Sequence, residues 1–224
     1  MKKVSSIIIS ILAVFAIGFT ACSSDDNNND TPNGTEEVVP GKNHKVLIAY
    51  FSEPLPDGVD ASTSASRLVI NDNVVGSVEY LAQVIQQNTG GDMVRIQTTT
   101  PYPGNFDDLA DQANQERQNN VHPALSTNIE DFDNYDVVFV GYPIWWYQMP
   151  MPMYSFFDKY DFKGKTIIPF SSHGGSGWSG SLNVISQLEP EATMVTGFSV
   201  SRERSASSAD NVKAWLQQIN MTSK

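Results

Sequence analysis

Two uninterrupted apolar runs constrain the fold of this chain more than any other feature. Residues 45–51 read Lys-Val-Leu-Ile-Ala-Tyr-Phe, and residues 136–141 read Asp-Val-Val-Phe-Val-Gly. A strand with one face in water alternates apolar and polar residues, whereas a strand covered on both faces is apolar throughout. The two runs therefore predict central strands of a sheet that helices cover on both sides.

Strand and helix patterns alternate along the rest of the chain. A helix is predicted at residues 76–87, because Val78, Leu81, Ala82 and Ile85 recur at helical spacing before an Asn-Thr-Gly-Gly stop. The further predicted strands are residues 92–97, 165–170 and 192–200, and the further helices are residues 106–119, 152–160, 181–188 and 207–219. Strict alternation predicts an α/β fold with a doubly wound, five-stranded parallel sheet and helices on both faces.

The N-terminal residues differ in character from the rest. Lys2 and Lys3 precede a short apolar stretch at residues 7–18, which falls short of the about 20 residues that a spanning helix needs. The stretch ends in Phe-Thr-Ala-Cys, which resembles a bacterial lipobox despite a Phe where Leu is usual. Residues 1–22 are therefore predicted to be a lipoprotein signal with Cys22 as the acylated residue. The alternative is an ordinary secretory signal with a chance cysteine.

Cys22 is the only cysteine of the chain, and acylation would remove a thiol that has no partner for a disulfide. Residues 23–43 are acidic, Asn-rich and poor in apolar side chains, which predicts a disordered tether before a domain at residues 44–224. The acidic run resembles the export signal of surface lipoproteins in Bacteroidetes, and a plain spacer is the alternative. We expect a lipid-anchored protein of the bacterial envelope, at the outer membrane or cell surface rather than the inner membrane.

The composition excludes several classes of partner. The formal net charge of −11 repels nucleic acid and anionic headgroups, so no nucleic acid is expected and the membrane is expected to be met only through the lipid anchor. The chain carries no metal-ligand spacing, no nucleophile elbow and no Gly-rich dinucleotide fingerprint. No metal and no catalytic residue are predicted.

The segments that follow the strands indicate a ligand site. With the strand order 2-1-3-4-5, the order reverses between the first and third strands, and ligands bind at the carboxyl ends there. Ser52 and then Gly76-Ser77 follow the first strand, an aromatic segment follows the third, and a Gly-rich segment follows the fourth. A planar aromatic cofactor with a phosphate tail would need this combination of residues.

Three segments resemble the flavin loops of a bacterial flavodoxin-like family: Tyr50-Phe51-Ser52, residues 141–146 (Gly-Tyr-Pro-Ile-Trp-Trp) and residues 169–177 (Pro-Phe-Ser-Ser-His-Gly-Gly-Ser-Gly). The resemblance implies a flavodoxin-like fold and an FMN cofactor. The cofactor-binding residues that it implies are Ser52, Gly76, Ser77, Pro143, Ile144, Trp145, Trp146, Tyr147, Ser172, His173, Gly174, Gly175 and Gly177.

Each loop has its own expected role and its own alternative. Ser52, Gly76 and Ser77 would hold the phosphate at a helix N-terminus, where unpaired N–H groups and a partial positive charge suit an anion. The family's hydroxyl-rich run ending in Gly-Asn-Thr is replaced by an insertion from Glu53 to Asn73. Glu53 would repel a phosphate unless it points away, while hydroxyls of the insertion and Arg67 could supplement the site.

The aromatic loop at residues 143–147 would lie along the isoalloxazine, unless its tryptophans only pack beneath the following turn. The glycines after His173 would let the backbone approach the flavin, unless the loop is simply flexible. The resemblance places His173 near the flavin N1–O2 edge, where a donor or cation would raise the potential, and a histidine bonded to loop backbone is the alternative. Arg202 and Arg204 could meet a substrate anion or remain solvated.

The sequence is compatible with three functions. The protein could carry electrons to a redox partner protein, or act as an FMN-dependent NAD(P)H:quinone oxidoreductase, or be a binding lipoprotein that kept the fold without the flavin. The scarcity of soluble NAD(P)H outside the cytoplasm favours the electron carrier.

Overall fold

The computed structural model describes residues 44–53, 67–70 and 72–222. The predicted signal, Cys22, the tether and most of the insertion lie outside these residues. Within the part that the structure describes, no helix combines the length and the apolar character that crossing a membrane requires.

The central sheet is parallel and has the predicted strand order. Its path is β4 (Asp92–Arg95), β1 (Val46–Tyr50), β5 (Val137–Pro143), β6 (Thr166–His173) and β7 (Thr193–Met194). The residues of β5 are all buried, as its uninterrupted apolar sequence predicts. The predicted α/β fold is confirmed.

The last predicted strand, at residues 192–200, is two short strands instead of one. β7 pairs with Thr166 and Ile167 of β6, and β8 (Phe198–Ser201) pairs with its carboxyl half from Phe170 onward. The break lies beside Pro169, which has no N–H to give to the ladder. A Cβ added to Gly197 would lie 2.5 Å from the Pro169 carbonyl oxygen, so the chain approaches β6 closely at this point.

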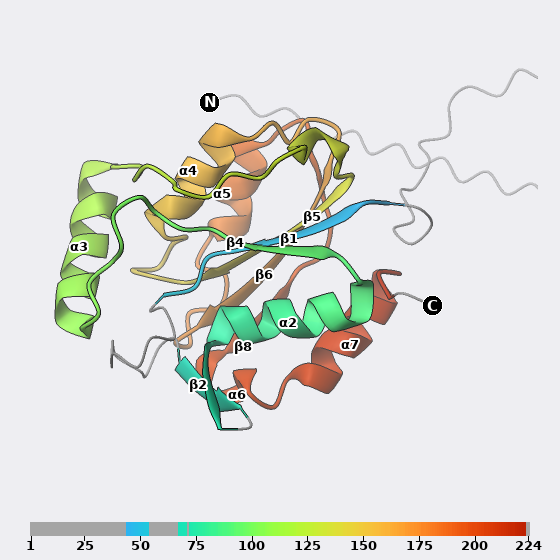
Figure 1. The fold of residues 1–224 in the computed structure, drawn as a ribbon, viewed down its shortest axis with the longest axis horizontal. Coiled ribbons are helices and arrows are strands. Elements are labelled where there is room, and N and C mark those ends of the chain that lie inside the picture. Colours follow the sequence, from blue (N-terminus) through green and yellow to red (C-terminus); the bar gives the residue numbers. More distant parts are fainter. Residues whose placement is uncertain (1–43, 54–66, 71, 223–224) are drawn as a thin grey trace, which may run out of the picture. The chain divides into compact units, whose positions relative to one another are not determined.

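Helices cover both faces of the sheet (Figure 1). On one face, α2 (Ser77–Thr89) and α7 (Ala209–Gln218) pack on alternate residues of β1 and β5, including Ile48 and Phe139. On the other face, α4 (Met151–Lys159), α5 (Ser181–Leu188) and part of α3 (Phe106–Asn119) pack on the intervening residues, such as Leu47 and Val138. The shorter elements are the 3-10 turn η1 (Phe132–Asn134) and α6 (Arg202–Ser205).

The described part of the insertion forms an antiparallel hairpin that the sequence analysis did not predict. Its strands are β2 (Arg67–Ile70) and β3 (Asn73–Gly76), and β3 runs directly into α2. Arg67 stands opposite Gly76 in the register. The hairpin thereby places the returning end of the insertion at the first turn of α2.

Candidate functional site

The three predicted loops meet at the carboxyl edge of the sheet. The Phe51 N–H donates to the Gly141 carbonyl oxygen at 2.8 Å, which joins the first loop to the end of β5. The Ile144 N–H donates to the Ser172 carbonyl oxygen at 2.9 Å, which joins the second loop to the third. Residues distant in sequence therefore surround one region at the reversal of strand order.

The first turn of α2 has the features of an anion site. Ser52 and Ser77 are buried, with exposed fractions of 2% and 1%. A Cβ on Gly76 would lie 2.0 Å from Ser52 Oγ, so only glycine lets the serine hydroxyl lie directly against the helix start. Ser77 Oγ is buried and has no hydrogen-bond partner among the described residues. An orphaned hydroxyl beside helical N–H groups that no side chain caps suits a phosphate.

Two charged side chains that the sequence analysis did not single out lie at the same helix start. Glu79 accepts a hydrogen bond from the Gly76 N–H at 3.3 Å, and Arg95 Nη1 lies 3.5 Å from Glu79 Oε2. Arg95 Nη2 also donates to the Ser52 carbonyl oxygen. In the sequence, the only indication of this contact is an arginine at the carboxyl end of the edge strand. The pairing of β4 with β1 is what brings it beside Ser52.

Burial and nearby carboxylates raise the pKa values of two tyrosines near the site. Burial and the nearby Glu79 raise the pKa of Tyr50 to about 12. Burial raises the pKa of Tyr102 as well, with its hydrogen bond to Glu116 and the charge of Glu53 adding to the effect. Tyr102 belongs to the core on one face of the sheet, and Tyr50 belongs to the core on the other face.

The aromatic loop separates its two tryptophans. Trp145 packs edge-on against Phe51 and Tyr102, with ring centroids 5.3 and 5.7 Å from theirs, and is partly buried against the core. Trp146 is 46% exposed, and its Nε1 donates to the Ala110 carbonyl oxygen of α3 at 3.1 Å. Tyr147 is 77% exposed. The two tryptophans, expected to share one role, therefore have different surroundings.

Trp146 and Tyr147 form a tight turn with unusual backbone angles. Their φ values are +47° and +62°, and Trp145 and Gln148 exchange two backbone hydrogen bonds of 3.0 Å across it. Such a turn normally takes Asn-Gly, because side chains with a Cβ are strained at positive φ. Strain of this kind is frequent at ligand sites.

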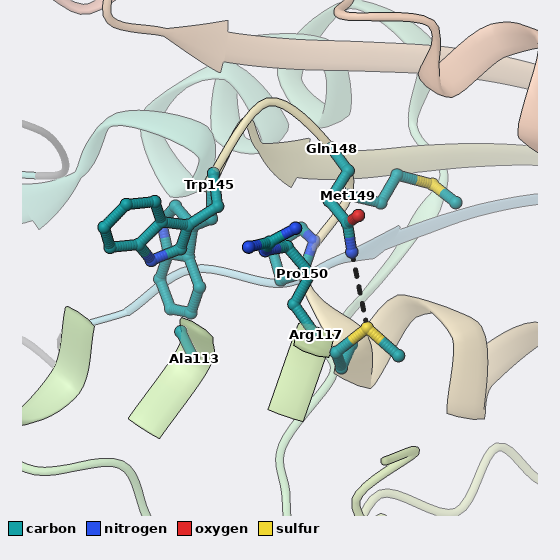
Figure 2. Close-up of a pocket in the computed structure, with 8 residues that line it drawn as sticks. Ala113, Arg117, Trp145, Gln148, Met149 and Pro150 are labelled. Atoms are coloured by element: carbon teal, nitrogen blue, oxygen red, sulfur yellow. Dashed lines mark hydrogen bonds between the residues drawn. The ribbon is translucent and has the colours of Figure 1, made fainter. Parts of the chain in front are cut away.

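Figure 2 shows the space between this loop and α3, lined in part by Ala113, Arg117, Trp145 and Pro150. Its volume of about 10 Å³ suffices for one water molecule and not for a flavin ring. Gln148 closes one side by a contact of 3.4 Å from Nε2 to Met151 Sδ. A planar ligand would therefore have to lie outside this cavity.

The Gly-rich loop holds His173 as a neutral donor. Its Nδ1 accepts the Gly175 N–H at 2.9 Å, which leaves the ring proton on Nε2. Partial burial, and then the charge of Arg204, lower the pKa of His173 below its usual 6.5. The imidazole is therefore uncharged at neutral pH and can donate through Nε2.

The remaining predicted residues differ in burial and in hydrogen bonding. Ser172 is buried, and its Oγ lies 3.4 Å from Ser205 Oγ of α6, so its hydroxyl already has a partner. Pro143 is buried and pairs with Ser172, while Ile144 packs partly on the core. Gly174 and Gly175 are exposed, and Gly177 is half-buried. Gly175 has a φ of +117°, which only glycine adopts readily, and Gly177 has a φ of +59°, which glycine adopts without strain.

The two arginines after the last strand have partners close to them in sequence. Arg202 Nε lies 3.0 Å from Glu203 Oε1, and Arg204 Nε lies 3.3 Å from Ser201 Oγ. Among the described residues no cluster of three or more His, Cys, Asp or Glu side chains could hold a metal ion.

Comparison with known proteins identifies the family. A family model described as flavodoxin matches residues 66–219. The chain belongs to the flavodoxin family. No protein of curated function matches the chain in sequence.

Solved structures agree with this assignment. A flavoprotein from Bacteroides eggerthii is 27% identical with a TM-score of 0.61, covering 79% of this chain and 98% of its own. A flavoprotein from Bacteroides uniformis is 25% identical with a TM-score of 0.60, covering 78% and 98%. A Lactobacillus acidophilus flavoprotein solved in complex with FMN is 15% identical with a TM-score of 0.54, covering 76% and 99%, and supports the fold alone. The family and these relatives support a flavin-binding redox protein.

Proposed function

We propose that this flavodoxin-family protein binds FMN and carries electrons between redox partners in the bacterial envelope. The observation that carries the proposal is the first turn of α2, where Ser77 has a buried hydroxyl without a partner and Gly76 packs directly on Ser52. The Lactobacillus flavoprotein, which shares the fold, was solved in complex with FMN, and FMN is the flavin that we propose for this chain.

Each loop contributes a distinct interaction in this proposal. Ser52, Ser77 and the helical N–H groups of α2 bind the phosphate. Trp146 and Tyr147 offer exposed aromatic faces, and His173 Nε2 offers a proton donor. Bound FMN supplies the capacity to accept and release one or two electrons.

The envelope location is proposed from the N-terminal sequence. Residues 1–22 have the charge, apolar stretch and terminal Cys22 of a lipoprotein signal, and residues 23–43 have the composition of a tether. A protein anchored outside the cytoplasm has little soluble NAD(P)H to use, so a partner protein or a quinone is the proposed source or acceptor of electrons.

The decisive experiment is a flavin titration of residues 23–224, with the flavin removed and added back. We expect FMN to bind with quenched fluorescence and a shifted visible spectrum, at a Kd below about 1 μM (near −8 kcal/mol). Weak binding without spectral change would refute the cofactor proposal and favour a flavin-free binding protein. Rapid turnover of NAD(P)H with a quinone would show that the protein is an oxidoreductase and not an electron carrier.

A further inference from the structure

We propose that Arg95 is the residue that selects the phosphorylated flavin, and that Glu79 holds the place of the phosphate until the cofactor binds. The inference rests on the proposed FMN function. It adds a cation, Arg95, to the serine hydroxyls at the N-terminus of α2. It also makes Glu79 a competitor of the phosphate for that cation.

Arg95 is built into the helix start. β4 pairs with β1 so that Arg95 stands beside Tyr50, and its guanidinium reaches the Ser52 carbonyl oxygen and the Glu79 carboxylate. The side chains of Arg95 and Glu79 are only 13% and 16% exposed. A guanidinium fixed this way can stay in place while one of its partners changes.

Two buried polar atoms, one on Arg95 and one on the first residue of α2, have no hydrogen-bond partner among the described residues. Arg95 Nε is buried and has no partner among the described residues, and the same holds for Ser77 Oγ. Buried polar groups are normally satisfied, so two orphans at one helix start indicate a missing acceptor. A phosphate has enough oxygens to accept from both, and the planar fork of an arginine matches phosphate better than an ammonium does.

Glu79 makes the interactions that an anion at this site would make. Its carboxylate accepts the Gly76 N–H and faces Arg95. Gly76 has no side chain to cap the helix in return, so the N–H groups of the first turn of α2 remain uncapped by a side chain. A phosphate dianion arriving here meets a like charge, so Glu79 must give up Arg95 for the phosphate to gain it.

The same contacts also fit a simple structural ion pair that caps α2. The two interpretations differ in what they predict for flavins with and without a phosphate. A structural pair affects FMN and riboflavin equally, whereas a phosphate-selecting residue affects FMN alone.

The experiment measures the Kd of FMN and of riboflavin for residues 23–224 and three variants, by fluorescence quenching at one ionic strength. We expect Arg95→Gln to weaken FMN binding about 10- to 100-fold, the effect of one or two charge-assisted hydrogen bonds, and to leave riboflavin binding unchanged. Glu79→Gln keeps an acceptor for the Gly76 N–H but loses the charge, and should tighten FMN binding several-fold. Lys163→Gln is the control, because this exposed lysine lies just before β6, at the opposite edge of the sheet, and its loss changes the net charge equally.

The outcomes separate the inference from the function beneath it. The inference is overturned if Arg95→Gln weakens the binding of FMN and of riboflavin equally. It is also overturned if Glu79→Gln leaves the FMN affinity unchanged. Both outcomes leave the proposed FMN binding intact. Should Arg95→Gln fail to fold, the Glu79→Gln result decides alone. A wild-type chain that binds neither flavin would overturn the proposed function itself, and the inference with it.

Discussion

The imidazole of His173 is held as a neutral donor by its own loop. Nδ1 accepts from the Gly175 N–H, so the neutral ring carries its proton on Nε2, and burial lowers the pKa of His173 and favours this neutral form. A donor stabilises the negative charge that reduction places on a flavin more than it stabilises the oxidised ring. We expect His173→Ala to lower the reduction potential of the second electron by roughly 60–130 mV, which corresponds to the loss of one hydrogen bond to a charged acceptor. The affinity for oxidised FMN should barely change.

Potentiometry of the FMN-loaded protein measures this shift. His44→Ala is the matched control, because His44 pairs with Asp136 just before β1 and β5, at the far edge of the sheet. An unchanged potential in His173→Ala would assign this histidine to loop structure only.

Glu189, at the end of α5, lowers the stability of the domain by an amount that depends on pH. Burial, and then the charges of Asp161 and Asp158, raise its pKa to about 7 from 4.5. Between these pH values the unfolded chain releases a proton that the native chain keeps, so stability falls as pH rises toward 7. We expect Glu189→Gln to raise the free energy of unfolding by about 1 kcal/mol at pH 8, allowing for solvent screening, and to have no effect at pH 4.

Urea unfolding at the two pH values measures the effect. Glu191→Gln is the control, since Glu191 is 64% exposed and paired with Lys163. A gain of the same size at both pH values would show that Glu189 acts through packing and not through its charge.

At the turn of Trp146 and Tyr147 we expect stability and the proposed flavin binding to oppose each other. Both residues have positive φ, and Tyr147 is too exposed to gain much from packing. Tyr147→Gly should relieve backbone strain and stabilise the flavin-free domain by about 1 kcal/mol. The same change removes an aromatic face and should weaken FMN binding.

Tyr147→Ala separates the two effects, because it removes the ring but keeps the Cβ. It should weaken FMN binding as much as Tyr147→Gly does while leaving the melting temperature of the flavin-free domain unimproved. Equal stability of the two variants would show that the turn stores no strain.

The whole molecule is proposed to consist of an anchor, a tether and one flavodoxin domain. Cys22→Ser should release the protein from membranes, because acylation needs the thiol and stable anchoring needs more than one acyl chain. Fractionation of cells into membrane and soluble parts measures this. Ser24→Ala, which keeps the cysteine, should remain with membranes, and retention of Cys22→Ser there would identify residues 7–18 as an uncleaved anchor.

Periodicity determined the layered architecture of the domain. Continuous apolar runs mark the buried strands β1 and β5, and helical spacing of apolar residues marks α2 and α7, because these patterns are local properties of the chain. The loops of the candidate site could also be predicted, since the carboxyl ends of parallel strands meet at one edge. The sequence therefore indicates where a flavin would bind.

Tertiary structure decided which side chains share that edge. The pairing of β4 with β1 brings Arg95 to Ser52, and Phe51 packs against the partly buried Trp145. The last strand breaks into β7 and β8 beside Pro169. Each outcome depends on register and packing between segments distant in sequence. No local pattern encodes such contacts, because a residue's own neighbours along the chain are the same whichever strand it pairs with.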